Sequence, residues 1–279
     1  MQKRDIVWIA FLILLGMWIG YQFLAHWKEK ECIVMAGSVA METFAEALTE
    51  KAGEAGITVK PEFIGSSAGI EALLKGTTQV AMVSRYLTKE EKNRGAEEHI
   101  VAYDGIVVVV NAENTVSNLS KEQLSDIFTG KIKNWKELGG IDEPVVVIGR
   151  ELGSGTRDAF EKLLSIEGKT VHANECDSIG VVKMKVELLR GAIGYVSLEV
   201  IEEEDSKVKV VAIDHVKPNA WSIGKGEYIL VRPFILATST ERNEQKELVR
   251  KLFLLLESRQ GDIVFERAGV AAAKKTASQ

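Results

Sequence analysis

The chain has 279 residues, of which 46% are hydrophobic and 27% charged, and it contains only four prolines. This composition is globular and excludes an intrinsically disordered chain. The net charge of −5 lacks the basic excess expected of a nucleic-acid-binding face, so we expect no nucleic-acid partner. The length allows one large domain or two medium domains, each with its own hydrophobic core.

The first predicted element is an almost uninterrupted apolar run over residues 6–25. Its 20 residues match a membrane-spanning helix better than the shorter apolar core of a signal peptide. Lys3 and Arg4 precede the run, so the positive-inside rule places the N-terminus in the cytoplasm and the rest of the chain outside. We interpret residues 1–30 as a membrane anchor or, alternatively, as a signal segment whose cleavage would release the protein into the periplasm.

The cysteines and histidines form no metal-binding pattern. Cys32 and Cys176 lack C-x-x-C spacing, and the four histidines are scattered along the chain. We therefore expect no metal site and no cofactor. Whether the two cysteines pair stays open, because one disulfide or two buried thiols fit the sequence equally well.

Three strand–turn–helix units follow residue 31. Short apolar runs are typical of buried strands, and the segment after each run has the apolar spacing or the charge pattern of a helix. We expect parallel strands joined by right-handed crossovers. The predicted strands lie at 33–36, 57–64 and 80–83, and the predicted helices lie at 40–52, 70–75 and 89–94.

The second half of the chain continues the alternation of strands and helices. Ser120 and Gln123 have the spacing of a capping box at the start of a short helix. The acidic run at 202–205 is interpreted as a solvated turn. Two parallel-sheet domains, with a break near 111–116, fit this pattern better than one. The remaining predicted strands lie at 106–110, 145–148, 192–196, 208–213 and 228–237, and the helices lie at two places within 118–140, then from 157 to 164, at 181–189, at 244–258 and at 261–268.

Turns rich in glycine, serine and threonine follow four of the predicted strands. A helix that begins at such a turn leaves unpaired backbone N–H groups and the positive end of its dipole facing outward. Small hydroxyl side chains there let an oxyanion approach and receive further hydrogen bonds. Serine and threonine are also ordinary helix caps, but four such turns at the carboxyl ends of parallel strands predict an anion site. The four turns are Gly37-Ser38, Gly65-Ser66-Ser67, Ser84-Arg85 and Gly153-Ser154-Gly155-Thr156.

A set of motifs in a fixed order resembles the phosphate-binding solute receptors of ABC-type phosphate importers. The resemblance spans about 33–272 and implies a type II, two-domain periplasmic-binding-protein-like (Venus flytrap) α/β fold. It also implies a discontinuous first domain, 31–112 plus 224–279, and a second domain at 113–223. The motifs are Gly65-Ser-Ser-Ala-Gly-Ile, Ala81-Met-Val-Ser-Arg, Asp104-Gly-Ile-Val-Val-Val-Val-Asn, Asp126-Ile-Phe-Thr-Gly-Lys-Ile-Lys-Asn-Trp, Arg150-Glu-Leu-Gly-Ser-Gly-Thr-Arg, Ala192-Ile-Gly-Tyr-Val-Ser, Arg232-Pro-Phe and Gln260-Gly.

The resemblance also implies which residues bind phosphate. Many relatives have serine or threonine where this chain has Val39, so only a backbone N–H remains there. Some relatives place an aspartate at the position of Ser84; this chain has none, and we take Asp104 as the substitute carboxylate that accepts the proton of phosphate. The residues carried over from the family are Ser38, Val39, Ser66, Ser84, Arg85, Arg150, Ser154, Gly155 and Thr156.

The expected function is binding without chemistry, followed by docking on the permease of an ABC phosphate importer. Receptors for sulfate, molybdate or tungstate, and a sensory or scaffold relative that has lost its ligand, stay open as alternatives. A hydrolase is a further alternative, because residues 65–69 match the G-x-S-x-G nucleophile elbow. Ser67 would then be the nucleophile, with His215 and either Asp205 or Asp214 as its partners.

Overall fold

The structure is a computed structural model, and it describes residues 15–18, 32–201, 207–240 and 246–273. Most of the predicted apolar span at 6–25, and the acidic run at 202–205, lie outside these residues. Within the described part of the chain, no helix has the length and apolar character needed to cross a membrane. Cys32 and Cys176 are both buried and both free thiols.

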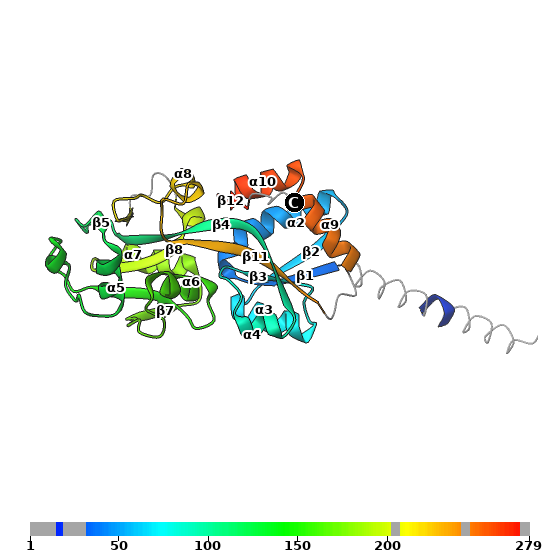
Figure 1. Ribbon diagram of the computed structural model, residues 1–279, viewed down its shortest axis with the longest axis horizontal. Coiled ribbons are helices and arrows are strands. Elements are labelled where there is room, and N and C mark those ends of the chain that lie inside the picture. The colour runs from blue at the N-terminus through cyan, green and yellow to red at the C-terminus, as the bar shows by residue number, and fades with distance from the viewer. Residues whose placement is uncertain (1–14, 19–31, 202–206, 241–245, 274–279) are drawn as a thin grey trace, which may run out of the picture.

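The first lobe is an α/β unit built on a mixed sheet. Strand β1 lies between β2 and β3 and is parallel to both, as the strand–turn–helix pattern predicts, while β11 runs antiparallel to β3. Helices α2, α9 and α10 cover one face of the sheet, and α3 and α4 lie on the other side (Figure 1). The elements are β1 (Cys32–Gly37), η1 (Val39–Met41), α2 (Glu42–Glu54), β2 (Thr58–Phe63), α3 (Ser66–Lys75), β3 (Val80–Val83), α4 (Lys89–Asn93), β11 (Val231–Ser239), α9 (Lys246–Leu256), α10 (Arg259–Arg267) and β12 (Ala271–Ala272).

The second lobe repeats this architecture on a smaller scale. Strand β6 is parallel to both β7 and β8, with α5 and α6 packed on one face and α7 on the other. The predicted capping box of Ser120 and Gln123 is confirmed at the start of α5. The elements are β5 (Asn118–Leu119), α5 (Lys121–Phe128), η2 (Trp135–Leu138), β6 (Val146–Arg150), α6 (Gly155–Leu164), β7 (Asn174–Cys176), α7 (Ile179–Leu188), β8 (Ala192–Ser197), η3 (Leu198–Val200), β9 (Val208–Val210), β10 (Ala212–Ile213) and α8 (Ala220–Gly224).

One long strand, β4 (Ala96–Asn111), runs through both lobes. It pairs with β11 up to Gly105 and with β8 from Ile106 onward, so the two sheets are joined edge to edge in the order β2-β1-β3-β11-β4-β8-β6-β7. Figure 1 shows β4 and β11 crossing between the two halves of the molecule. The sequence predicts only 106–110 as strand, because the polar residues that precede this run hide the half of β4 that lies in the first lobe.

The hydrophobic core is divided between the lobes. One cluster lies on each face of the first sheet and one on each face of the second, and none of these four combines the interior of both lobes. The chain passes into the second core at Ile106 and leaves it at about Leu230, whereas the resemblance to known receptors implies domain limits at 112 and 224. The difference arises because the apolar run of β4 belongs to the second core, and so do Tyr228 and Leu230.

Candidate functional site

Three serines from three different turns meet at the edge of the first sheet. Ser38 Oγ donates to Ser84 Oγ at 2.8 Å, and the backbone N–H of Ser84 donates to Ser66 Oγ at 3.2 Å. All three are at most 2% exposed. They converge because β1, β2 and β3 are neighbours in the sheet and the turns follow their carboxyl ends.

Glycines make this convergence sterically feasible. Gly65 has a φ of +89°, a conformation that residues with a Cβ rarely adopt, and α3 begins directly after it. A Cβ on Gly69 would lie 2.6 Å from the carbonyl oxygen of Ala36, so α3 packs directly on the end of β1. Ser66 is therefore in the first turn of α3, although the sequence pattern predicts a helix only from residue 70. Val39, the first residue of η1, is half-buried beside Ser38.

The second lobe contributes the N-terminus of α6. Ser154 is the N-cap, and its side chain accepts a hydrogen bond from the backbone N–H of Arg157. Gly155 and Thr156 follow in the first turn, where backbone N–H groups have no acceptor within the helix. These residues are buried, although a helix of 10 residues normally exposes its first turn to solvent. The positive end of the helix dipole thus points into the protein.

The N-terminus of α6 lies directly against the three serines. A Cβ on Gly155 would stand 2.2 Å from Ser66 Oγ and 2.6 Å from Ser84 Oγ. The backbone N–H of Ser67 also donates to the carbonyl of Gly153 at 3.2 Å, which links the two turns directly. The two lobes are therefore closed on each other at the predicted anion site.

Arg150, at the end of β6, is a cation of the second lobe that precedes the turn before α6, and it is 1% exposed. Its Nε and Nη2 both donate to the carboxylate of Glu151, at 2.9 Å each, and also to backbone carbonyls at Cys176 and Asp177. Nη1 is buried and has no hydrogen-bond partner among the described residues. A buried guanidinium nitrogen of this kind normally has an acceptor, and an anion is the acceptor that suits it best.

Arg85, by contrast, uses all its donors on the protein. The guanidinium donates to Glu91 through both Nη atoms, to Asp158 of the second lobe through Nε, and to the carbonyl of Tyr86 and the hydroxyl of Ser67. These contacts occupy its five N–H groups, so none is left for an anion in this closed conformation. Burial alone would lower the pKa of Arg85, but the carboxylates of Glu91 and Asp158 raise it.

Asp104 is completely buried at the crossing between the lobes. Its Oδ2 accepts from Ser197 Oγ at 2.7 Å and from two nitrogens of Arg232, whereas Oδ1 has no partner among the described residues. Nη1 of Arg232 donates to Thr156 Oγ1 at 2.5 Å. The carboxylate is thus joined to the N-terminus of α6 through one arginine.

Glu199 is a third buried ionisable group at this crossing. Burial raises its pKa to about 8, and the nearby negative charge of Asp104 raises it further in the same direction. Glu199 Oε2 also has no hydrogen-bond partner among the described residues. The side chain is therefore mostly protonated at neutral pH, so it adds little negative charge next to the predicted anion site.

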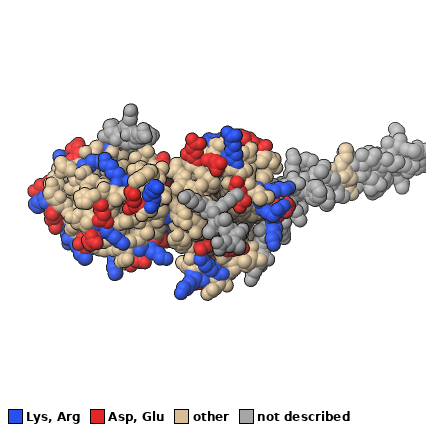
Figure 2. Space-filling model, turned by 45° about the horizontal axis from the view of Figure 1, so that its top comes forward, with Lys and Arg blue, Asp and Glu red and all other residues tan. Residues whose placement is uncertain are grey.

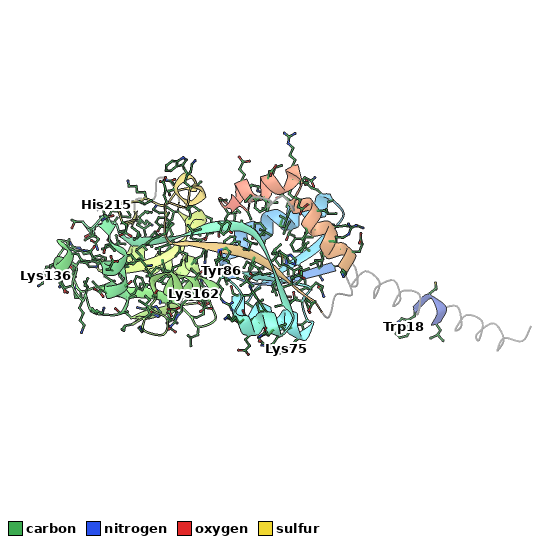
Figure 3. All side chains as sticks on the ribbon, in the orientation of Figure 1. Trp18, Lys75, Tyr86, Lys136, Lys162 and His215 are labelled. Atoms are coloured by element: carbon green, nitrogen blue, oxygen red, sulfur yellow. The ribbon has the colours of Figure 1, made fainter. Side chains whose placement is uncertain are left out.

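A cavity of about 840 Å³ lies between the lobes on the outer side of Arg85. Tyr86 and Lys162, which Figure 3 labels where the lobes meet, line it from opposite lobes, together with Ser67, Asp158 and Arg232. Ser38, Ser66, Ser84 and Arg150 do not line this cavity and lie deeper. In the view of Figure 2, positive and negative side chains are interspersed over both lobes, so attraction of an anion depends on the groups between the lobes.

The residues of the hydrolase alternative are not assembled. Ser67 Oγ accepts a hydrogen bond from Arg85 and lies at the cavity between the lobes. Figure 3 places His215 at the outer part of the second lobe, and the backbone of Asp214 pairs there with Leu119. Asp205 lies outside the described residues. Among the described residues, the side chain bonded to Ser67 Oγ is that of Arg85, which donates and cannot act as a base.

Sequence reasoning assigned no role to Arg232, Asp158 or Glu199, although all three contact or adjoin the predicted site. Arg232 belongs to the Arg232-Pro-Phe motif, which supports the family resemblance but does not indicate what the arginine contacts. Asp158 lies two residues beyond the glycine-rich turn on the first turn of α6. Its pKa is raised by burial, against the opposing effect of Arg85, which marks it as a carboxylate held between the lobes.

Comparisons with known proteins show the family of this chain. A family model described as a PBP superfamily domain matches residues 25–252. The Phosphate-binding protein PstS of Bacillus subtilis is 33% identical over 205 residues, which cover 72% of this chain and 68% of that protein. Its namesake from Borreliella burgdorferi is 30% identical, covering 73% and 76%.

Solved structures give the same result. A crystal structure with bound phosphate, assigned as a phosphate ABC transporter substrate-binding protein from Clostridium perfringens, has a TM-score of 0.81 and 34% identity. The match covers 87% of this chain and all of that one. An ABC-type phosphate transport receptor from Vibrio cholerae has a TM-score of 0.72 and 31% identity, covering 86% and 99%. The two-lobed α/β fold expected from the sequence is therefore confirmed.

Proposed function

The chain belongs to the family of phosphate-binding receptors of ABC-type phosphate importers, and on that premise we propose that it binds inorganic phosphate between its lobes. The single observation that carries the proposal is the meeting of two anion-binding elements from different lobes. The serine cluster of the first lobe lies against the N-terminus of α6, next to Arg150 Nη1, which has no partner among the residues that the structure describes.

Binding at this place follows from the hydrogen-bonding character of the residues. The hydroxyls of Ser66 and Ser84, the first-turn N–H groups of α6 and Arg150 Nη1 are able to donate to an oxyanion. Ser38 gives its own proton to Ser84 Oγ and so leaves the Ser84 proton to donate. Bonds to a charged acceptor are stronger than neutral ones, and several of them together replace the water that phosphate loses. Asp104 is our candidate for the acceptor of the proton that phosphate retains at neutral pH.

Release and delivery follow from the two-lobed design. Because the donors come from both lobes, phosphate stabilises the closed conformation relative to the open one by its difference in affinity. The closed receptor then docks on the permease of an ABC phosphate importer. We place the protein outside the cytoplasm, held to the membrane by residues 6–25, a segment that ends where the family match begins, at residue 25. The apolar run and the basic residues before it support this anchoring.

Calorimetry with phosphate, arsenate, sulfate and molybdate on the fragment 31–279 tests the proposal. We expect one site per chain for phosphate and arsenate and weaker binding of sulfate and molybdate. Arg150→Met, which removes the unpartnered Nη1, should weaken phosphate binding by about 30-fold or more. Tight binding of sulfate or molybdate with no heat from phosphate would favour a receptor for another oxyanion. Labelling of Ser67 by a fluorophosphonate would instead revive the hydrolase alternative.

A further inference from the structure

Arg232 occupies the crossing between the lobes and contacts both of them. Its side chain is 0% exposed, and it faces Asp104 in register across β11 and β4. Nε and Nη2 donate to Asp104 Oδ2 at 2.9 and 2.7 Å, and Nη2 also donates to Ser197 Oγ at 3.2 Å. Nη1 donates to Thr156 Oγ1 at 2.5 Å.

The direction of these hydrogen bonds is fixed by chemistry. A guanidinium has five N–H donors and no acceptor, so both hydroxyls that touch Arg232 must accept from it. Ser197 gives its own proton to Asp104 at 2.7 Å. Thr156 Oγ1 accepts from Arg232, and among the described residues no group accepts the Thr156 proton. The Thr156 O–H is therefore left to donate.

Arg232 also separates the Thr156 hydroxyl from a carboxylate. Asp104 is a buried carboxylate held by the same arginine that contacts Thr156, and a charged acceptor attracts a hydroxyl proton more strongly than a neutral one. Arg232 occupies the space between them and takes up Oδ2 itself. It thereby keeps the proton of Thr156 away from Asp104.

We propose that Arg232 is a positioning residue that sets Thr156 as a hydrogen-bond donor to the bound anion. The inference rests on the proposed function, since the anion is the phosphate assigned above. Arg232 does not touch phosphate in this account; it acts through Thr156 Oγ1 and is itself held by Asp104. Because Asp104 and Arg232 lie on the crossing strands and Thr156 lies on α6, this donor is set only when the lobes are closed.

A double-mutant cycle on phosphate affinity tests the proposal. Thr156→Val removes the hydroxyl and should weaken binding about 10-fold or more, whereas Thr156→Ser keeps it and should bind within about threefold of the wild type. Arg232→Lys keeps a positive charge beside Asp104, but one ammonium does not reproduce the fork that also reaches Thr156. It should weaken binding about 10-fold. The double variant Arg232→Lys/Thr156→Val should bind phosphate no more weakly than Thr156→Val alone. Thr156→Val already removes the hydroxyl through which Arg232 acts, so the second substitution has nothing further to remove.

The outcomes separate this inference from the proposed function. No heat of phosphate binding by the wild type would remove the proposed function itself. If the wild type binds phosphate and the losses of affinity in Arg232→Lys and Thr156→Val multiply to about 100-fold in the double variant, the proposed role of Arg232 is wrong. The proposed function is not affected by that result. Wild-type affinity of Arg232→Lys would overturn the role of Arg232 too. Arg250→Lys, an exposed arginine of α9 paired with Glu247, is the matched control and should leave affinity unchanged. If Arg232→Lys does not fold, Arg232→Gln, whose amide still donates to Asp104, replaces it in the cycle.

Discussion

Arg85 of the first lobe and Asp158 of the second form an ion pair, with Nε 2.9 Å from Oδ2. Arg85 is anchored in its own lobe by a second carboxylate, that of Glu91, at 2.7 Å. Only the contact with Asp158 crosses between the lobes, so it exists in the closed conformation and is lost when the lobes separate. The pair therefore acts on the closing equilibrium and not on the anion.

Asp158→Asn should weaken phosphate binding by about two- to tenfold, mainly through faster dissociation. The effect is modest because the Asp158 side chain is 40% exposed and solvent screens the pair. The preference for phosphate over sulfate should not change, since no anion-binding donor is altered. Stopped-flow dissociation rates and competition calorimetry measure the two quantities. Asp126→Asn, which breaks an exposed pair with Lys131, is the control. A changed anion preference would show that Asp158 takes part in the site itself.

Gly155→Ala should block closure while leaving each lobe folded. The new Cβ would stand 2.2 Å from Ser66 Oγ and 2.9 Å from Ser66 Cβ, and both atoms belong to the other lobe. We expect phosphate affinity to fall by about 10-fold or more, with little change in the melting temperature of the ligand-free protein. Gly180→Ala in α7 is the matched control, because nothing lies within 4 Å of its Cβ position. Equal affinities of wild type and Gly155→Ala would mean that the lobes close differently around the ligand.

The convergence of Ser38, Ser66 and Ser84 could be predicted from the sequence. Each follows a short apolar run, and parallel strands joined by helices bring their carboxyl ends to one edge of a sheet. The glycine-rich turn before α6 could be predicted on the same ground. The contact between the serine turns of the first lobe and the turn before α6, where Gly155 lies against Ser66, exists because the lobes are closed. Local sequence patterns do not predict this contact, but the resemblance to known two-lobed receptors does.

The roles of the charged residues could not be predicted in this way. The resemblance to known receptors implies that an arginine at Arg85 can pair across the cleft instead of binding the anion, but the sequence does not identify Glu91 and Asp158 as its partners. Arg232 and Asp104 are 128 residues apart, and only the register of β11 on β4 brings them together. Burial of all of them within the closed junction also depends on the packing of two lobes, which local patterns do not contain.

Asp104→Asn should weaken phosphate binding and improve sulfate binding. Phosphate at neutral pH keeps a P–OH that needs an acceptor, whereas sulfate has no proton to give and is repelled by a carboxylate. Oδ1 of Asp104 has no hydrogen-bond partner in the part of the chain that the structure describes, so it can accept, and an amide at this position can donate as well. Competition of the two anions for wild type and variant measures the preference.

The stability of the Asp104→Asn variant needs its own measurement. Asp104 pairs with Arg232 in a site that is 0% exposed, and breaking such a pair costs about 3–5 kcal/mol of unfolding free energy. The anion preference is a ratio and is independent of this loss as long as the variant is folded. Glu151→Gln is the comparison, because both oxygens of Glu151 are already bonded to Arg150. If Asp104→Asn leaves the preference for phosphate over sulfate unchanged, Asp104 is not the acceptor of the phosphate proton.

Glu199→Gln should remove a pH dependence of stability that the wild type shows between about pH 4.5 and 8. Burial and the charge of Asp104 raise the pKa of Glu199 from 4.5 to about 8 in the folded protein. In this window the folded state holds a proton that the unfolded state has lost, so the free energy of unfolding falls as the pH rises, by up to about 1.4 kcal/mol per pH unit. The charged groups around Glu199 are Asp104, Arg232 and Glu42, and none of them is altered by the substitution.

Glutamine resembles the protonated carboxyl, so urea unfolding should show the variant close to the wild type near pH 4.5 and more stable than it at pH 8. Glu247→Gln, at an exposed pair in α9, is the control and should follow the wild-type curve. Parallel curves for wild type and Glu199→Gln would show that the carboxyl of Glu199 is ionised in the folded protein at neutral pH.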